Sequence, residues 1–123
     1  MRGMMLAVGV GLLGLALPSG EAKAASFDCA RARAADEVAV CANRTLSELD
    51  TEMGALWYAY SRVPMFMGGN GARRDAAQAF LDRRRTCRAN VVCLTAAYRA
   101  RIADLRRGID GAMAEYRRLQ NGD

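Results

Sequence analysis

The spacing of four cysteines restricts the fold of this chain more than any other feature of its sequence. They are Cys29, Cys41, Cys87 and Cys93 in a chain of 123 residues. In a small exported domain such cysteines predict two disulfides, and the sequence leaves three pairings open. We expect the local pairing, Cys29 with Cys41 and Cys87 with Cys93, whose partners are 12 and 6 positions apart. In the chain-entropy model these rings stabilise the fold by about 2.9 and about 2.4 kcal/mol.

Other uses of the cysteines fit the sequence poorly, because the chain contains no histidine. A zinc site would need all four cysteines, whose spacing is not that of two C-x2-C pairs. A c-type haem needs C-x-x-C-H, and a nucleophilic cysteine needs a neighbouring base. We therefore expect no metal, no cofactor and no catalytic residue.

The first 24 residues are typical of a secretory signal peptide. Arg2 precedes an apolar run from Met4 to Leu17, and Ala22-Lys23-Ala24 supplies small residues for cleavage after Ala24. The run is shorter than the roughly 20 residues that cross a bilayer as a helix. Cys29 lacks the small-residue box of a lipid-anchored protein. We expect a periplasmic or secreted mature chain without a membrane span.

The expected mature chain, residues 25–123, is a single small domain with a modest positive charge. Removing the leader leaves 18 − 2 = 16 basic and 13 − 1 = 12 acidic residues, a net charge of +4, and every remaining basic residue is arginine. The densest basic cluster is the Arg83–Arg85 triplet, and no basic stripe with interleaved aromatics is present. We therefore expect no nucleic-acid partner.

The apolar periodicity is helical throughout, and strand signals are absent. We predict a short helix over 32–41, a second over 45–61 beginning at a Thr45–Glu48 capping box, a third over 72–87 and a fourth over 91–119. Pro64 ends the second helix and Asn90 caps the fourth. The predicted fold class is all-α: a small antiparallel bundle of one short N-terminal helix and three longer helices, stapled by two disulfides.

Each longer helix carries a predicted core stripe. The stripes comprise Leu46, Leu49, Met53, Leu56, Trp57 and Tyr60 on the second helix, Ala76, Ala79, Phe80 and Arg84 on the third, and Leu94, Tyr98, Ile102, Leu105, Ile109, Ala112, Met113, Tyr116 and Leu119 on the fourth. Asp50 and Arg101 lie beside two of these stripes. We expect them to form a buried pair, with the Tyr98 hydroxyl as an additional partner.

The loop "PMFMGGNG" is open to two interpretations. Met65, Phe66 and Met67 either fold back over the open end of the bundle or form a flexible apolar tip for a protein partner. Carboxylates close in sequence, such as Asp36 with Glu37, are interpreted as surface or arginine-paired groups rather than as a glycosidase pair. We therefore expect a non-enzyme.

Two sequence blocks resemble the LprI-type lysozyme-inhibitor domain. The first is "SFDCARARAADEVAVCANRTLSELD", which carries Phe27, Asp28, Cys29, Glu37, Cys41, Leu46, Leu49 and Asp50. The second is "FLDRRRTC" followed by "CLTAAYRARIADL", which carries Phe80, Leu81, Arg84, Cys87, Cys93, Leu94, Tyr98, Arg101, Ile102 and Leu105. The chain departs from the family pattern at Ala34, Trp57, Phe80 and Arg85.

The resemblance implies a protein that binds a lysozyme and occludes its cleft stoichiometrically. We expect the exported chain to be a monomer. The matched residues Glu37, Leu49, Asp50, Arg84, Tyr98 and Arg101 have the character of scaffold. The contact with the partner would then fall on the Met65–Gly71 loop, or on an acidic face around Asp36, Glu37, Glu48 and Glu52. The alternative is an envelope module that has a structural or interaction role and no lysozyme target.

Overall fold

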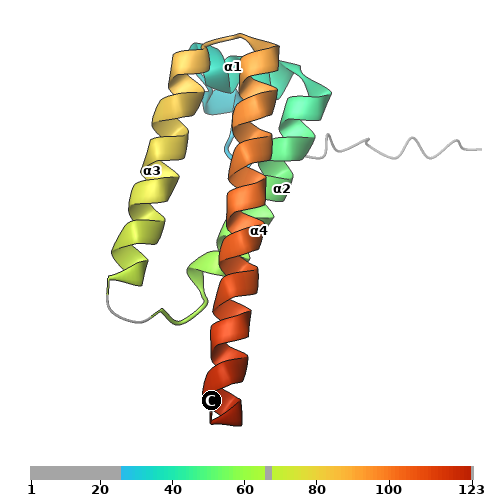
Figure 1. Ribbon diagram of the computed structural model, residues 1–123. Coiled ribbons are helices and arrows are strands. Elements are labelled where there is room, and N and C mark those ends of the chain that lie inside the picture. Colours follow the sequence, from blue (N-terminus) through green and yellow to red (C-terminus); the bar gives the residue numbers. More distant parts are fainter. Residues whose placement is uncertain (1–25, 66–67, 123) are drawn as a thin grey trace, which may run out of the picture.

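The chain folds into a helical bundle, shown in the computed structural model of Figure 1. The structure describes residues 26–65 and 68–122. Within them lie a 3-10 turn and four α-helices: η1 (Cys29–Arg31), α1 (Ala35–Ala42), α2 (Arg44–Ser61), α3 (Gly69–Cys87) and α4 (Val91–Asn121). The short α1 covers one end of the three longer helices, and α4 runs on past α2 and α3 toward the C-terminus. The predicted all-α fold class is confirmed.

Side-chain caps fix where the two main helices begin. The Asn43 side chain accepts from the Leu46 N–H at 3.0 Å, and the Asn90 side chain accepts from the Cys93 N–H at 2.9 Å. The predicted cap at Asn90 is therefore confirmed, whereas the predicted Thr45–Glu48 capping box is wrong. Thr45 lies inside the first turn of α2, because Asn43 is the N-cap residue and its side chain accepts from the Leu46 N–H.

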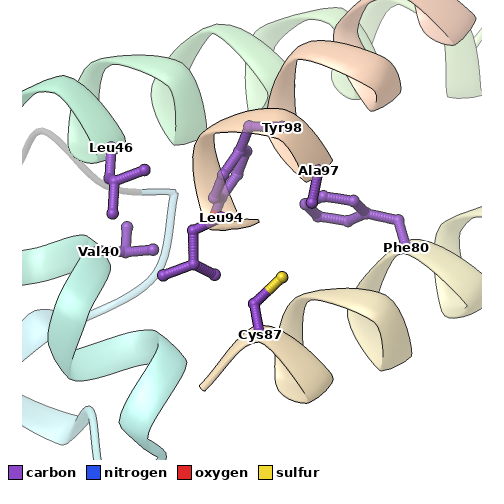
Figure 2. Packing of buried hydrophobic residues seen from close by; sticks show 7 residues of the cluster. All are labelled: Val40, Leu46, Phe80, Cys87, Leu94, Ala97 and Tyr98. Atoms are coloured by element: carbon purple, nitrogen blue, oxygen red, sulfur yellow. The ribbon is translucent and has the colours of Figure 1, made fainter. Parts of the chain in front are cut away.

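The hydrophobic core lies at the α1 end of the bundle (Figure 2). Its buried residues are Val40, Leu46, Phe80, Cys87, Leu94, Ala97 and Tyr98. The Phe80 and Tyr98 rings pack edge to face with centroids 5.2 Å apart, which joins α3 to α4. Burying one such large side chain stabilises the fold by about 1.5–3 kcal/mol.

The buried face of α3 differs from the predicted one. Phe80 and Arg84 are buried as expected, but Ala76 and Ala79 are exposed. Arg73 is buried instead and donates to the Val63 carbonyl at 3.0 Å, which ties the start of α3 to the end of α2. Arg73 counts as polar in a sequence pattern, although the stem of a long arginine packs as an apolar group, so the apolar spacing does not mark this face.

Both predicted disulfides are present. Cys29–Cys41 joins η1 to α1 with the Cα atoms 5.7 Å apart, and Cys87–Cys93 joins the end of α3 to the first turn of α4 with a Cα separation of 5.5 Å. The two bonds therefore clamp the end of the bundle that holds the core.

None of the helices in residues 26–65 and 68–122 combines the length and apolar content needed to cross a bilayer. The predicted signal peptide lies outside the described residues.

Candidate functional site: an apolar groove opposite a closed polar network

An apolar groove of about 1070 Å³ lies where α2 ends and α4 continues. Its lining residues are Ala59, Arg62, Val63, Pro64, Met65, Arg107, Gly108, Gly111, Ala112, Met113, Glu115, Tyr116, Leu119 and Gln120. A groove of this size is at the upper end of the range for ligand-binding sites in proteins. It is therefore large enough to receive part of a partner.

The unequal lengths of the two helices create this groove. At 1.5 Å per residue, the 18 residues of α2 span about 27 Å and the 31 residues of α4 span about 46 Å. The apolar stripe of α4 continues beyond the end of α2, where none of the described helices covers it. Met113, Tyr116 and Leu119 are therefore 49%, 57% and 55% exposed, although the periodicity predicted them as core.

Gly108 leaves room for a side chain of α2 at the head of the groove. A Cβ atom built on Gly108 would lie 2.6 Å from Cζ of Tyr60, so a larger residue here would displace the Tyr60 ring. A Cβ atom on Gly111 would meet nothing within 4 Å, so the groove is open on that side.

The charged groups on the rim of the groove are held by neighbouring groups of the chain. The Arg62 guanidinium lies 3.3 Å from the centroid of the Tyr58 ring and donates to the Tyr58 carbonyl at 3.0 Å. Arg107 pairs with Asp104, and Glu115 pairs with Arg118. The groove consequently offers an apolar floor with a polar, internally paired rim, which is typical of a protein-binding surface.

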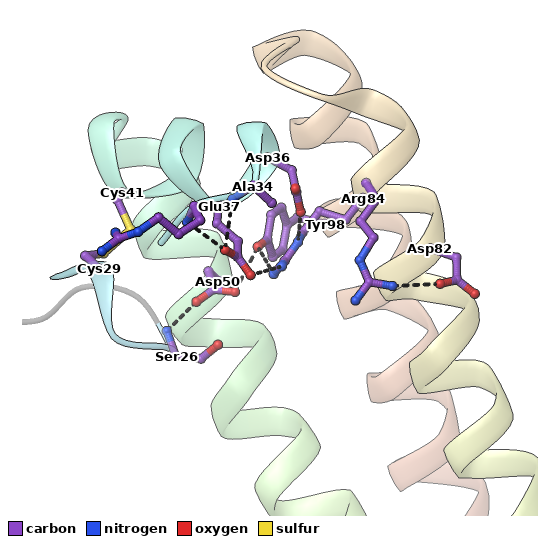
Figure 3. Close-up of polar contacts among 12 residues, drawn as sticks. Ser26, Cys29, Ala34, Asp36, Glu37, Cys41, Asp50, Asp82, Arg84 and Tyr98 are labelled. Carbon is purple, nitrogen blue, oxygen red and sulfur yellow. Dashed lines mark hydrogen bonds and ion pairs between the residues drawn. A yellow bond between two sulfur atoms is a disulfide. The ribbon is translucent and has the colours of Figure 1, made fainter. Parts of the chain in front are cut away.

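A buried polar network crosses the core at the other end of the molecule (Figure 3). Nε of Arg84 lies 2.7 Å from Oδ2 of Asp36, and an Arg84 terminal nitrogen donates to the Tyr98 hydroxyl at 3.4 Å. That hydroxyl donates to Oδ1 of Asp50 at 2.8 Å. Four residues, one from each of the four α-helices, are thus linked in one chain of hydrogen bonds.

Burial and these contacts shift the ionisation of two members of the network. Burial raises the pKa of the Tyr98 hydroxyl, and the neighbouring Asp50 charge raises it further. Burial acts to lower the pKa of the Arg84 guanidinium, but its contacts with Tyr98 and Asp36 prevail and the pKa lies above its ordinary value. Tyr98 therefore remains a neutral donor and Arg84 a cation at physiological pH.

This network has no surface on which a substrate could be held. Tyr98 and Asp50 are fully buried, and the side chains of Arg84 and Asp36 are 8% and 3% exposed. The arrangement fixes the relative positions of the helices, as expected of a buried hydrogen-bonded cluster. Within the described residues, no group of three cysteine, aspartate or glutamate side chains could hold a metal ion.

The structure separates two residues that the sequence placed together. Asp50 is bound by Tyr98, as predicted, but the predicted ion pair between Asp50 and Arg101 is absent. The guanidinium of Arg101 instead lies 5.6 Å from the centroid of the Trp57 ring. Burial lowers the pKa of this group, whose Nε has no hydrogen-bond partner among the described residues. The buried pair instead joins Asp36 on α1 to Arg84 on α3.

The remaining scaffold residues occupy supporting positions. Glu37 accepts from the Ala34 N–H at 3.3 Å at the start of α1, and Leu49 packs against the core while partly exposed. Of the predicted acidic face, Asp36 is buried against Arg84. Glu48 and Glu52 remain at the surface, where they pair with Arg44 and Arg106.

The predicted contact loop is only partly described. Met65 lines the groove, whereas Phe66 and Met67 lie outside the described residues. The sequence did not identify Met113, Tyr116 and Leu119 as surface residues. The signal that could have done so is the length of the fourth apolar stripe, which exceeds that of any stripe available to pair with it.

Comparison with known proteins finds no matching family model, curated protein or solved structure.

Proposed function

We propose that this chain is an exported, non-catalytic binding protein that inhibits a lysozyme by occluding its cleft one to one. The observation that carries the proposal is the apolar groove between the end of α2 and the C-terminal half of α4. Three large side chains on α4 are half exposed there, and a soluble protein seldom leaves such a contiguous apolar surface without a partner.

The choice of a lysozyme as the partner is based on the motif resemblance. The expected signal peptide supports export to the periplasm or the cell exterior, where a lysozyme would be encountered. The two motif blocks lie in the closed core and the polar network, at residues such as Asp50, Arg84 and Tyr98. They therefore account for the scaffold. Contact with the partner falls on the groove, which lies outside both blocks.

The charge of the chain favours apolar recognition over electrostatic attraction. The expected mature chain carries +4, so it repels a basic lysozyme at long range and associates slowly. Because salt screens that repulsion, the association rate with a basic lysozyme should rise with ionic strength. Binding through charge complementarity would show the opposite dependence.

The test is the rate of cell-wall lysis by lysozymes of different classes, measured with increasing amounts of the mature chain. The proposal predicts that at least one class is slowed, with inhibition complete near one equivalent. A lysis rate that stays unchanged with every class of lysozyme would contradict the proposal. The alternative hypothesis, an envelope interaction module, would then remain.

A further inference from the structure

The segment that begins at Ser26 packs against α2 through two separate contacts. The Ser26 backbone N–H donates to Oδ2 of Asp50. One helical turn later, a Cβ atom built on Gly54 would lie 2.9 Å from Cβ of Ser26, so only glycine leaves room for the segment. Figure 3 shows Ser26 and Asp50 facing each other at the edge of the polar network.

The residues that follow extend this attachment. The Phe27 ring lies 5.2 Å from the Arg84 guanidinium and packs against the core. Asp28 accepts from the Ala30 N–H at 3.0 Å, and Cys29 forms its disulfide with Cys41. The segment from Ser26 onward is thus held at every residue up to the first disulfide.

The buried network contains one more negative than positive charge. Asp36 is paired with Arg84, while Asp50 is fully buried and receives hydrogen bonds from two neutral groups, the Tyr98 hydroxyl and the Ser26 N–H. Among residues 26–65 and 68–122, no arginine forms an ion pair with Asp50. A buried carboxylate without a cation is unfavourable, and a nearby cation would relieve that penalty.

We propose that the missing cation is the amino terminus created by removal of the leader, and that Asp50 is its receiving site. This inference depends on the export that is part of the proposed function. A signal peptidase adds water across the Ala24–Ala25 peptide bond, which leaves a carboxylate on Ala24 and an ammonium group on Ala25. That ammonium nitrogen is three covalent bonds from the Ser26 nitrogen, which already binds Asp50.

This arrangement couples processing to stability. In the precursor, position 25 contributes a neutral peptide group, whereas in the cleaved chain it contributes a charge beside a buried carboxylate. Hydrogen bonds that involve a charged donor stabilise by roughly twice as much as neutral ones. The cleaved chain should consequently be the more stable form, with about a tenfold smaller unfolding equilibrium constant than a chain whose terminal charge is removed.

The composition of the chain makes a single-site test available. Lys23 is the only lysine of the sequence and is lost with the leader, so the α-amine is the sole primary amine of a chain that begins at Ala25. Acetylation of the purified mature protein therefore neutralises the terminus alone. Urea unfolding of the free and acetylated forms, each with Asp50 and with Asp50→Asn, gives a double-mutant cycle.

Acetylation should raise the unfolding constant about tenfold in the parent and less than about twofold in Asp50→Asn. Equal effects in both backgrounds, or none in the parent, would overturn the proposal. If Asp50→Asn does not fold, one glycine added before Ala25 serves instead. It moves the amine away from Asp50, so the effect of acetylation should fall below about twofold, and an unchanged effect would overturn the proposal.

The two proposals can fail separately. Mass spectrometry of the exported protein should find Ala25 as the first residue, and a different terminus would refute the processing step. The double-mutant cycle measures stability in the absence of lysozyme, so a negative result there does not contradict the proposed lysozyme binding. Conversely, a lysis rate that stays unchanged does not contradict the proposed contact between the amino terminus and Asp50.

Discussion

At the scale of single residues, adjacent arginines perform different tasks. Arg84 is buried between Asp36 and Tyr98, whereas its neighbour Arg85 is exposed and pairs with Asp82 at 3.0 Å. The sequence presents both within one basic triplet. Only the helical phase, which turns one side chain toward α1 and the next toward solvent, distinguishes their contributions.

Replacing Arg84 should therefore be far more damaging than replacing Arg85. Arg84→Ala leaves Asp36 as an uncompensated buried charge and should lower the free energy of unfolding by about 3–5 kcal/mol. Arg85→Ala removes an exposed pair and should change it by less than about 1 kcal/mol. Urea unfolding of the two variants checks this, and similar losses would show that the buried pair does not hold the fold together.

Tyr98 should make stability depend on alkaline pH. The pKa of Tyr98 in the folded protein lies above the value of about 10 for an unfolded tyrosine. Burial and the charge of Asp50 on α2 raise this pKa, and Arg84 on α3 offsets only part of the increase. A raised pKa means that its contribution is complete below about pH 10 and is lost as the pH rises further.

Tyr98→Phe should remove this alkaline loss. It should also lower stability at neutral pH by about 1–3 kcal/mol, because Asp50 loses a buried donor. Unfolding measured from pH 7 to 11 on both proteins tests the assignment, which fails if the two show the same dependence above pH 10.

At the scale of helices, the sequence predicted which elements form but not every face that they present. The boundaries of α2 and α4 follow from Asn43, Asn90 and the apolar spacing. The α3 face was only partly predicted, because Arg73 faces the core in place of Ala76 and Ala79. The end of α4 was misassigned because an apolar stripe does not reveal whether another helix reaches it. The Asp36–Arg84 pair joins residues 48 positions apart, and such a contact leaves no local signal.

Two helix glycines should respond oppositely to alanine. Gly111→Ala enters open space and should stabilise the protein by up to about 1 kcal/mol through helix propensity. Gly54→Ala has the same propensity gain but displaces Ser26 from Asp50, so it should lower the denaturation midpoint. Equal gains at both positions would indicate that the segment at Ser26 is not bound to α2.

At the scale of the whole molecule, the two ends of the bundle have separate roles. The disulfides, the core and the polar network occupy one end, and the groove occupies the other. A scaffold fixed at one end can present an uncovered helix face at the other without losing its fold. The predicted scaffold residues and the missed groove residues accordingly lie apart.

Removing either disulfide should weaken the scaffold without changing the groove. Paired serine substitutions at Cys29 and Cys41 should lower the free energy of unfolding by about 2.9 kcal/mol, and those at Cys87 and Cys93 by about 2.4 kcal/mol. Denaturation of the two variants measures the losses. Unchanged stability in both would contradict the role of the disulfides as clamps.

The most direct measurement compares lysozyme inhibition by two variants that place the same charge on exposed apolar residues. Met113→Asp lies in the groove, and Val92→Asp lies at the opposite end of α4, where the native side chain is 81% exposed. Circular dichroism should show both folded. The account predicts that Val92→Asp slows lysis as the parent does while Met113→Asp has lost at least about tenfold in potency, and equal potency of the two would contradict the assignment of the groove.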